Sequence, residues 1–209
     1  MSRKKVKTGF IKYLNDGEFK LLLDGLERWD YNFRCMFAIA YYVGLRRVEI
    51  CRIKTADFKD DFRILRVKVA KAGKVIDRIV PEKLRLELIS YWFCQKFFST
   101  NEYFFQPSIT SGSKKPHIQP SSLNWKFHIS RKKAGLEDIY YIRKNGSPLY
   151  RVSFHTLRHS FLERFYKASG NDLVITSQTI GHTKTSTTVR YVASGKRKER
   201  EKLIVNMIC

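Results

Sequence analysis

Long apolar runs, paired cysteines and acidic residues are all scarce in this chain. No stretch approaches the roughly 20 consecutive apolar residues of a membrane-spanning helix, and the first ten residues, MSRKKVKTGF, lack the apolar centre of a secretory signal peptide. The four cysteines are scattered, with no C-x-x-C pair and no histidine at zinc spacing. We therefore expect a cytoplasmic protein with no membrane segment, with reduced thiols and with no metal site.

The shortage of acidic residues leaves a strong positive charge. Nineteen Asp and Glu stand against 41 Lys and Arg, which gives a formal net charge of +22 and a pI near 10.0. A surface of this charge attracts polyanions, so nucleic acid is the first candidate partner. With 209 residues, of which 43% are hydrophobic, the chain can also bury a core of its own.

Hydrophobic periodicity predicts a mainly α-helical fold with a small antiparallel β-sheet, an α+β protein. A capping box formed by Asn15 and Glu18 marks the start of the first helix. Helical spacing of apolar residues extends over residues 15–29, 33–43, 47–53, 82–98 and 121–135, and over two or three segments after residue 153.

Two stretches have the pattern of β-hairpins. Between residues 62 and 80 the apolar period changes to two on either side of a glycine turn, and a second hairpin is expected around 145–146. The segment 99–120 is rich in Ser, Thr, Gly and Pro. We expect this segment to be the longest loop and an internal hinge.

One helix combines apolar and titratable residues in residues 154–161, which read FHTLRHSF. Arg158 falls inside the apolar stripe, where an unpaired charge costs several kcal/mol, so its guanidinium needs an anion. His155 lies on the flank of the same face, and His159 points further round. The alternative is that Arg158 pairs with a buried carboxylate and both histidines are structural. The stripe expected to face the core consists of Phe154, Leu157, Phe161 and Phe165.

Two further segments carry cationic residues that suit a phosphate. The segment GLRRVE places Arg46 and Arg47 at the start of a short helix, and Glu49 is spaced to steady Arg46. The hairpin tip AKAGK holds Lys71 and Lys74 on a glycine turn. Taken alone, the first is an ordinary basic corner and the second an ordinary solvated turn.

The segment TIGHTKTSTTVRYV places His182 directly after a glycine and Tyr191 nine residues later. Taken together, these segments resemble the tyrosine recombinase family, also called the phage integrase family. The family's boxes G-L-R-x-x-E, H-x-L-R-H followed by Ser or Thr, and G-H with a tyrosine nine residues on match residues 44–49, 155–160 and 181–191. The resemblance covers residues 12–195 and implies the tyrosine recombinase catalytic-domain fold.

The resemblance implies a site-specific recombinase that cleaves and rejoins DNA strands without metal, ATP or another cofactor. Tyr191 would attack the scissile phosphorus and form a 3′-phosphotyrosyl link, which conserves the bond energy for rejoining. Arg46 and Arg158 would stabilise charge on the non-bridging oxygens, and His182 would add a donor.

The remaining family positions imply proton transfer and support. His155 would accept or relay the proton of the tyrosine, and a hairpin lysine would protonate the departing 5′-oxygen. Lys71 matches the family lysine, and Lys74 is the alternate because the following turn is longer than usual in the family. Glu49 and His159 would support the site.

The implied partner is double-stranded DNA at specific sites, bound by a homo-oligomer of two to four protomers. We expect a basic arm at residues 1–11, the catalytic domain at 12–195 and a tail helix at 196–209, which docks on its own core or on a neighbouring protomer. Because family members usually carry an N-terminal core-binding domain, we expect a fragment or a minimal member. The basic residues expected to contact backbone phosphates are Arg3, Lys4, Lys5, Arg47, Lys132 and Lys133.

Three alternatives stay open. A type IB topoisomerase uses a similar residue set to relax DNA, and an accessory DNA-binding protein would keep the fold without the chemistry. A metal-dependent nuclease would use His155 and His159 as ligands at helical spacing. Chelator-sensitive cutting would identify the nuclease, whereas a recombinase forms a covalent adduct in the presence of EDTA.

Overall fold

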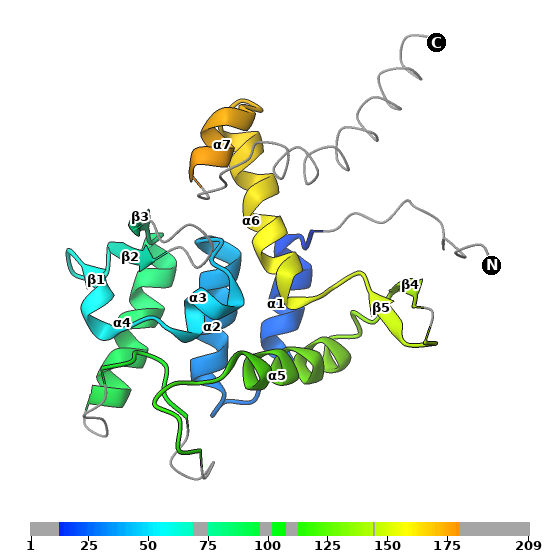
Figure 1. Cartoon of the computed structure of the whole chain (residues 1–209), viewed down its shortest axis with the longest axis horizontal. Helices are drawn as coiled ribbons and strands as arrows, with labels where there is room; N and C mark the ends of the chain where they lie inside the picture. Colours follow the sequence, from blue (N-terminus) through cyan, green and yellow to red (C-terminus); the bar gives the residue numbers. More distant parts are fainter. Residues whose placement is uncertain (1–12, 69–74, 97–101, 108–112, 144, 180–209) are drawn as a thin grey trace.

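The computed structural model describes residues 13–68, 75–96, 102–107, 113–143 and 145–179 (Figure 1). It is mainly helical with small antiparallel sheets, as the sequence predicts. No described helix is both long enough and apolar enough to cross a membrane. The helices are α1 (Asp16–Asp24), α2 (Tyr31–Tyr42), α3 (Arg47–Cys51), α4 (Glu82–Lys96), α5 (Pro120–Lys133), α6 (Phe154–Ala168) and α7 (Leu173–Thr179), with a 3₁₀ turn η1 (Thr55–Asp57).

Helix α2 is the centre of the core. It packs against α4 on one side and α6 on the other (Figure 1). All seven residues from Cys35 to Tyr41 are buried, which explains why this segment of the sequence is apolar all round instead of amphipathic. On α1, the ring of Phe19 stacks on that of Tyr41 with centroids 3.8 Å apart. The core therefore holds α2 in a fixed place between the two helices that flank it.

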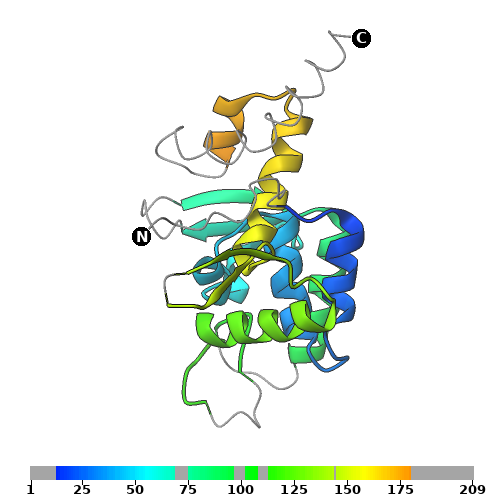
Figure 2. The same ribbon diagram turned by 90° about the vertical axis from the view of Figure 1, so that its right-hand side faces the viewer.

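The two predicted hairpins form two separate sheets. The first has three antiparallel strands in the order β1 (Phe58–Lys59), β2 (Ile64–Lys68) and β3 (Val75–Ile79), and the second pairs β4 (Ile139–Ile142) with β5 (Pro148–Tyr150). Figure 2 shows the hairpin of β2 and β3 projecting from the helices on the side away from α1.

The burial pattern of β3 is the reverse of what side-chain polarity predicts. Arg78 is only 6% exposed, whereas its neighbour Ile79 is 84% exposed. Arg78 faces inward because it pairs with the buried Leu65 of β2. Leaving an isoleucine in water forgoes about 1.5–3 kcal/mol of burial energy, and burying a guanidinium costs several kcal/mol. The burial of apolar side chains alone therefore does not explain why β3 pairs with β2 in this register.

The segment expected to be a hinge is anchored where it is described. Phe104 and Phe105 are both buried, and the backbone N–H of Phe104 donates to the carbonyl oxygen of Ile53 at 2.9 Å. Tyr103 forms a backbone bridge with Lys54. The expectation of a hinge was therefore wrong for residues 102–107, because two aromatic side chains fix this stretch in the core.

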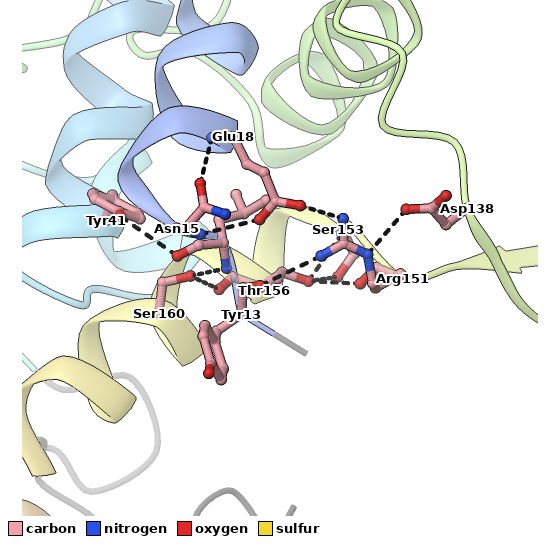
Figure 3. Close-up of polar contacts among 10 residues, drawn as sticks. Tyr13, Asn15, Glu18, Tyr41, Asp138, Arg151, Ser153, Thr156 and Ser160 are labelled. Carbon is pink, nitrogen blue, oxygen red and sulfur yellow. Dashed lines mark hydrogen bonds and ion pairs between the residues drawn. The ribbon is translucent and has the colours of Figure 1, made fainter. Parts of the chain in front are cut away.

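A polar network fixes the N-terminal end of α6 against α1 (Figure 3). The buried hydroxyl of Ser160 accepts a hydrogen bond from the backbone N–H of Leu14 at 2.8 Å and donates to the carbonyl oxygen of Thr156 at 2.9 Å. Arg151, just before the helix, donates to Glu18 at 2.5 Å and to Asp138 at 3.1 Å. The start of the chain's described part is thus tied directly to the helix that carries FHTLRHSF.

We predict that Ser160→Ala lowers the free energy of unfolding by about 1–3 kcal/mol, because the N–H of Leu14 loses its buried acceptor. Urea unfolding followed by circular dichroism measures this change. Ser121→Ala, at an exposed position in the first turn of α5, is the matched control and should change the value by less than about 0.5 kcal/mol. Equal values for the two variants would contradict the role assigned to Ser160.

Candidate active site

The turn between α2 and α3 places Arg46 and Glu49 together. Arg46 is the N-cap residue of α3, and Glu49 accepts two hydrogen bonds from it: from the backbone N–H at 2.7 Å and from the guanidinium Nη1 at 2.9 Å. This confirms that Glu49 steadies Arg46. The Glu49 side chain is buried, so these contacts are protected from water.

Arg158 joins the same carboxylate from the second turn of α6. Its side chain is buried, Nη1 donates to the carbonyl oxygen of Gly44, and Nη1 lies 4.0 Å from Oε2 of Glu49. Gly44 has a φ of +74°, and a Cβ there would collide with the ring of Phe161. Only glycine therefore allows this close approach, which turns its carbonyl toward Arg158.

Burial raises the pKa of Glu49, but hydrogen bonds from Arg46 and the charges of Arg46 and Arg158 outweigh it and hold this pKa below the usual value for a glutamate. The carboxylate is therefore ionised at neutral pH. Because the folded-state pKa is depressed, the stabilisation is present above the unfolded-state pKa and is lost as the pH falls through the folded-state value. The two arginines thus share one permanent counter-charge.

The structure corrects two expectations for α6. The anion that Arg158 was expected to need from its substrate is supplied in part by the protein, as in the alternative of a buried carboxylate: Arg158 is 3% exposed and its Nη1 lies 4.0 Å from Oε2 of Glu49. The predicted apolar stripe is buried only at Phe154 and Leu157. Phe161 and Phe165 are half-buried and stack on each other, because the C-terminal half of α6 extends past the core toward α7 (Figure 1).

His155 and His159 lie together on the more exposed side of α6. Their ring centroids are 4.9 Å apart, with the rings nearly perpendicular. His155 is exposed and His159 half-buried, so His155 is the more exposed of the two, although His159 was expected to point further round from the core face. Among the described residues no three His, Cys, Asp or Glu side chains gather as metal ligands. The nuclease hypothesis therefore finds no third ligand within that part of the chain.

Seven of the predicted site residues and the tail lie outside the described residues. The last described pair of the first hairpin, Lys68 with Val75, closes the strands on either side of residues 69–74. Helix α7 ends at Thr179, directly before the third family box. The predicted residues outside the described ranges are Lys71, Lys74, His182, Tyr191 and the arm residues 3–5, together with the tail at 196–209.

The basic residues predicted to contact DNA differ in their surroundings. Lys132 is exposed in the last turn of α5, whereas the neighbouring Lys133 forms an ion pair with Glu27. Arg47 is half-buried in the first turn of α3. Partial burial lowers the pKa of His128 on α5, and the charges of Arg131 and Arg47 lower it further. The positive charge of Arg47 on α3 thus lowers the pKa of a histidine on α5, the helix that packs against α3.

A further buried arginine, Arg78, was missed at the level of sequence. Arg78 on β3 is buried, and its Nε has no hydrogen-bond partner. Burial lowers the pKa of Arg78 to about 10; the charge of Glu49 opposes this and that of Arg46 adds to it. The residue remains a cation at neutral pH. The signal was the alternation of VIDRIV: a period of two puts Arg78 on the same face as Ile76 and Val80, where a charged residue interrupts an apolar face.

Next to this cluster lies a pocket of about 480 Å³ between α3, η1 and β2. Glu49 forms part of its wall, and so do four basic side chains, of which Lys54 is ion-paired with Glu102 and Arg66 with Asp77. Basic side chains thus line this pocket from α3 to the end of β2. The four basic residues are Arg52, Lys54, Arg66 and Lys68.

Comparison with known sequences shows to which family this chain is similar. The sequence model described as the phage integrase family matches residues 12–198. Tyrosine recombinase XerA of Pyrococcus furiosus is 27% identical over 209 residues, which cover 98% of this chain and 66% of the relative. A tyrosine recombinase of Pseudothermotoga lettingae is 30% identical over 160 residues, which cover 75% of this chain and 48% of the relative. The chain spans about half to two thirds of the length of these curated relatives.

Solved structures share the fold. The crystal structure of XerA recombinase has a TM-score of 0.69 at 22% identity, covering 91% of this chain and 65% of that one. The lambda integrase catalytic core has a TM-score of 0.60 at 17% identity, covering 81% of this chain and 94% of that one. A lambda integrase tetramer bound to a Holliday junction has a TM-score of 0.63 at 18% identity, covering 86% and 47%.

We predict that Glu49→Gln lowers the free energy of unfolding at pH 7 by about 3–5 kcal/mol, because it removes the counter-charge from the buried guanidinium of Arg158 and the half-buried one of Arg46. The deficit should shrink as the pH falls through the folded-state pKa of Glu49, where the wild-type carboxyl also becomes neutral. Urea unfolding at a series of pH values measures both effects.

Asp77→Asn is the matched control for Glu49→Gln, because it removes a carboxylate from an exposed ion pair on the neighbouring hairpin. It should leave stability nearly unchanged across the series. A pH-independent deficit for Glu49→Gln would show that its charge does not hold the arginines.

Proposed function

The chain belongs to the phage integrase family, and we propose that it is a site-specific tyrosine recombinase, which cleaves and rejoins DNA strands through a 3′-phosphotyrosyl intermediate. The convergence of Arg46 and Arg158 on Glu49 carries this proposal. These residues come from the first two family boxes, far apart in sequence, and they meet at one buried carboxylate.

Two positioned guanidinium groups suit the charge that develops in phosphoryl transfer. Each offers a planar fork of donors that matches two oxygens of a phosphate. Because Glu49 holds Arg46 in place before any substrate arrives, little of the binding energy is spent on ordering that side chain. Burial strengthens the interaction, since water does not screen it.

The proposed reaction exchanges one phosphoester bond for another. The phenolic oxygen of Tyr191 attacks the scissile phosphorus, and the bond to the 5′-oxygen breaks, leaving a 3′-phosphotyrosyl link and a free 5′-hydroxyl. His155 accepts or relays the phenolic proton, and Lys71 or Lys74 protonates the departing oxygen. Attack by the 5′-hydroxyl of another strand reverses these steps and releases Tyr191. The bond count is conserved, so the scheme needs no ATP.

The proposed partner is double-stranded DNA, bound by a homo-oligomer. The net charge of +22 supports a polyanionic partner, and one relative of the same fold was crystallised as a tetramer on a Holliday junction. We assign phosphate contacts to Arg47, Lys132 and the basic arm, and a weaker one to Lys133, whose charge Glu27 already engages. The tail at 196–209 is proposed to dock on its own core or on a neighbour.

The proposal predicts a covalent protein–DNA adduct that forms in EDTA. Suicide duplexes carrying candidate sites from the DNA that flanks the coding sequence should trap the adduct, visible as a band shift on a denaturing gel. Tyr191→Phe should abolish the band, because the nucleophilic oxygen is gone. Tyr150→Phe, which removes a hydroxyl elsewhere in the fold, is the control and should preserve it. No adduct at any site would overturn the proposal.

Arg158→Lys separates chemistry from binding. We predict that cleavage slows by about 10²–10³-fold, because a point charge cannot replace a fork aimed at two oxygens. Binding to duplex DNA should change by no more than about twofold, since the formal charge is unchanged. Arg66→Lys, an exposed position on β2, should change neither. Equal losses of cleavage and binding would mean that Arg158 serves general DNA affinity instead.

A further inference from the structure

The pocket between α3, η1 and β2 adjoins the carboxylate that holds Arg46. Glu49 forms part of the pocket wall and accepts the hydrogen bond of 2.9 Å from the guanidinium of Arg46. On the other side, Lys68 lines the pocket and is the last residue of β2, the strand that leads to the hairpin tip. A DNA strand that runs from Arg46 toward β2 therefore crosses this pocket.

Three of the six charged side chains on the pocket wall are already held in ion pairs. Each of these three has a counter-charge within 3 Å, so it offers little net charge to a ligand. The pairs are Glu49 with Arg46, Lys54 with Glu102, and Arg66 with Asp77.

The other three charged side chains leave one positive charge in excess. Arg52 and Lys68 are exposed, and neither forms an ion pair within the described part of the chain. Asp57 accepts a hydrogen bond from the backbone N–H of Lys54 at 2.8 Å, so its carboxylate caps the 3₁₀ turn η1. Two positive charges and one negative charge leave a surplus of one. This surplus equals the charge of one phosphodiester group in DNA.

The shape of the pocket also suits one unit of a DNA strand. Its volume of about 480 Å³ lies within the roughly 300–1,000 Å³ that is usual for ligand pockets. Besides the charged groups, three apolar side chains line it and offer a surface for the sugar next to a phosphate. These residues are Val48, Ile53 and Val67.

The length of α3 relates the pocket to the scissile phosphate. Arg46 is the N-cap residue of this helix and Arg52 its C-cap residue. At a rise of 1.5 Å per residue, their backbone positions lie roughly 9 Å apart. One DNA strand carries a phosphate about every 3.4 Å along the helix axis. The pocket is thus about two or three phosphates away from the one proposed to lie at Arg46.

We propose that this pocket binds one non-scissile phosphate of the DNA strand, held between Arg52 and Lys68. The inference rests on the proposed function, because the strand belongs to the DNA substrate of that reaction. Arg52 and Lys68 bind the strand and take no part in breaking its bond. Lys54 and Arg66, whose charges are already matched, do not form this contact.

The salt dependence of duplex binding tests the number of phosphates that are held. Each phosphate contact contributes about 0.9 to the magnitude of the slope of log K against log salt. The double variant Arg52→Gln/Lys68→Gln should lower this magnitude by about 0.9, because both side chains hold one phosphate. Fluorescence anisotropy of a labelled duplex over a series of potassium chloride concentrations measures the slope. No reduction, or a reduction of about 1.8 from two separate phosphates, would overturn the inference.

The double variant Lys20→Gln/Arg28→Gln is the matched control, because it removes one lysine and one arginine that are also exposed. Lys20 lies on α1, which Figure 2 shows on the side away from the hairpin of β2 and β3. Arg28 precedes α2, at the opposite end of that helix from α3. This control should change the slope by less than about 0.3. Equal slopes for the two double variants would show that only overall charge matters, which contradicts a pocket.

Neutral linkages locate the phosphate. In the duplex that traps the wild-type adduct, single methylphosphonates replace successive phosphates of the cleaved strand. One position, about two or three linkages from the scissile phosphate, should weaken wild-type binding by about five- to tenfold. The same linkage should weaken binding of Arg52→Gln/Lys68→Gln by less than about twofold, because the contact is already lost and the two changes do not add. If no position distinguishes the two proteins, the pocket holds no backbone phosphate.

A free phosphate ion has the same chemistry as a backbone phosphate, so a further measurement separates the two sources. Replacing chloride by inorganic phosphate at equal ionic strength should weaken wild-type duplex binding by less than about twofold. A larger loss that disappears in Arg52→Gln/Lys68→Gln would mean that the pocket holds the free ion. That result would overturn the inference.

The rate of adduct formation separates binding from chemistry. Arg52→Gln/Lys68→Gln should reach a maximal rate within about threefold of wild type, but at a higher protein concentration, because the contact is the same before and during cleavage. A maximal rate lowered by about tenfold at an unchanged concentration dependence would contradict the assigned role. If wild-type protein forms no adduct, the proposed function itself fails, whereas the salt slope still tests the pocket.

Discussion

The buried carboxylate of Glu49 is the interaction on which the site depends. It accepts hydrogen bonds from both the backbone and the side chain of Arg46, and it lies 4.0 Å from the guanidinium of Arg158. These arginines come from α3 and α6, which are separated in sequence by both sheets. Because neither guanidinium is well solvated, each needs an anion in the free protein, and one carboxylate serves both.

The fold fixes the geometry around that carboxylate from several directions. Helix α2 is buried between α4 and α6 and brings Gly44 to the place where its carbonyl accepts from Arg158. The Ser160 network ties α6 to α1. Each contact uses a buried side chain, so displacement of one element would change the position of the others.

Much of the fold and part of the site could be predicted from sequence, because the signals are local. The capping box of Asn15 and Glu18 is present, and the helices and hairpins lie where periodicity placed them. The i, i+3 spacing of Arg46 and Glu49 was enough to predict their contact. The prediction of a hinge at 99–120 was wrong for residues 102–107, because composition shows only that a segment is irregular. It does not reveal that Phe104 and Phe105 fill the core.

What the sequence by itself determined is the set of elements, the family boxes and the excess of positive charge, since each depends on spacing or composition along the chain. What only the tertiary structure decided is how buried charges are matched: that Arg158 is enclosed near Glu49, and that Arg78 faces inward while Ile79 faces water. Burial and Coulomb energy depend on neighbours from distant segments, so no local pattern specifies them.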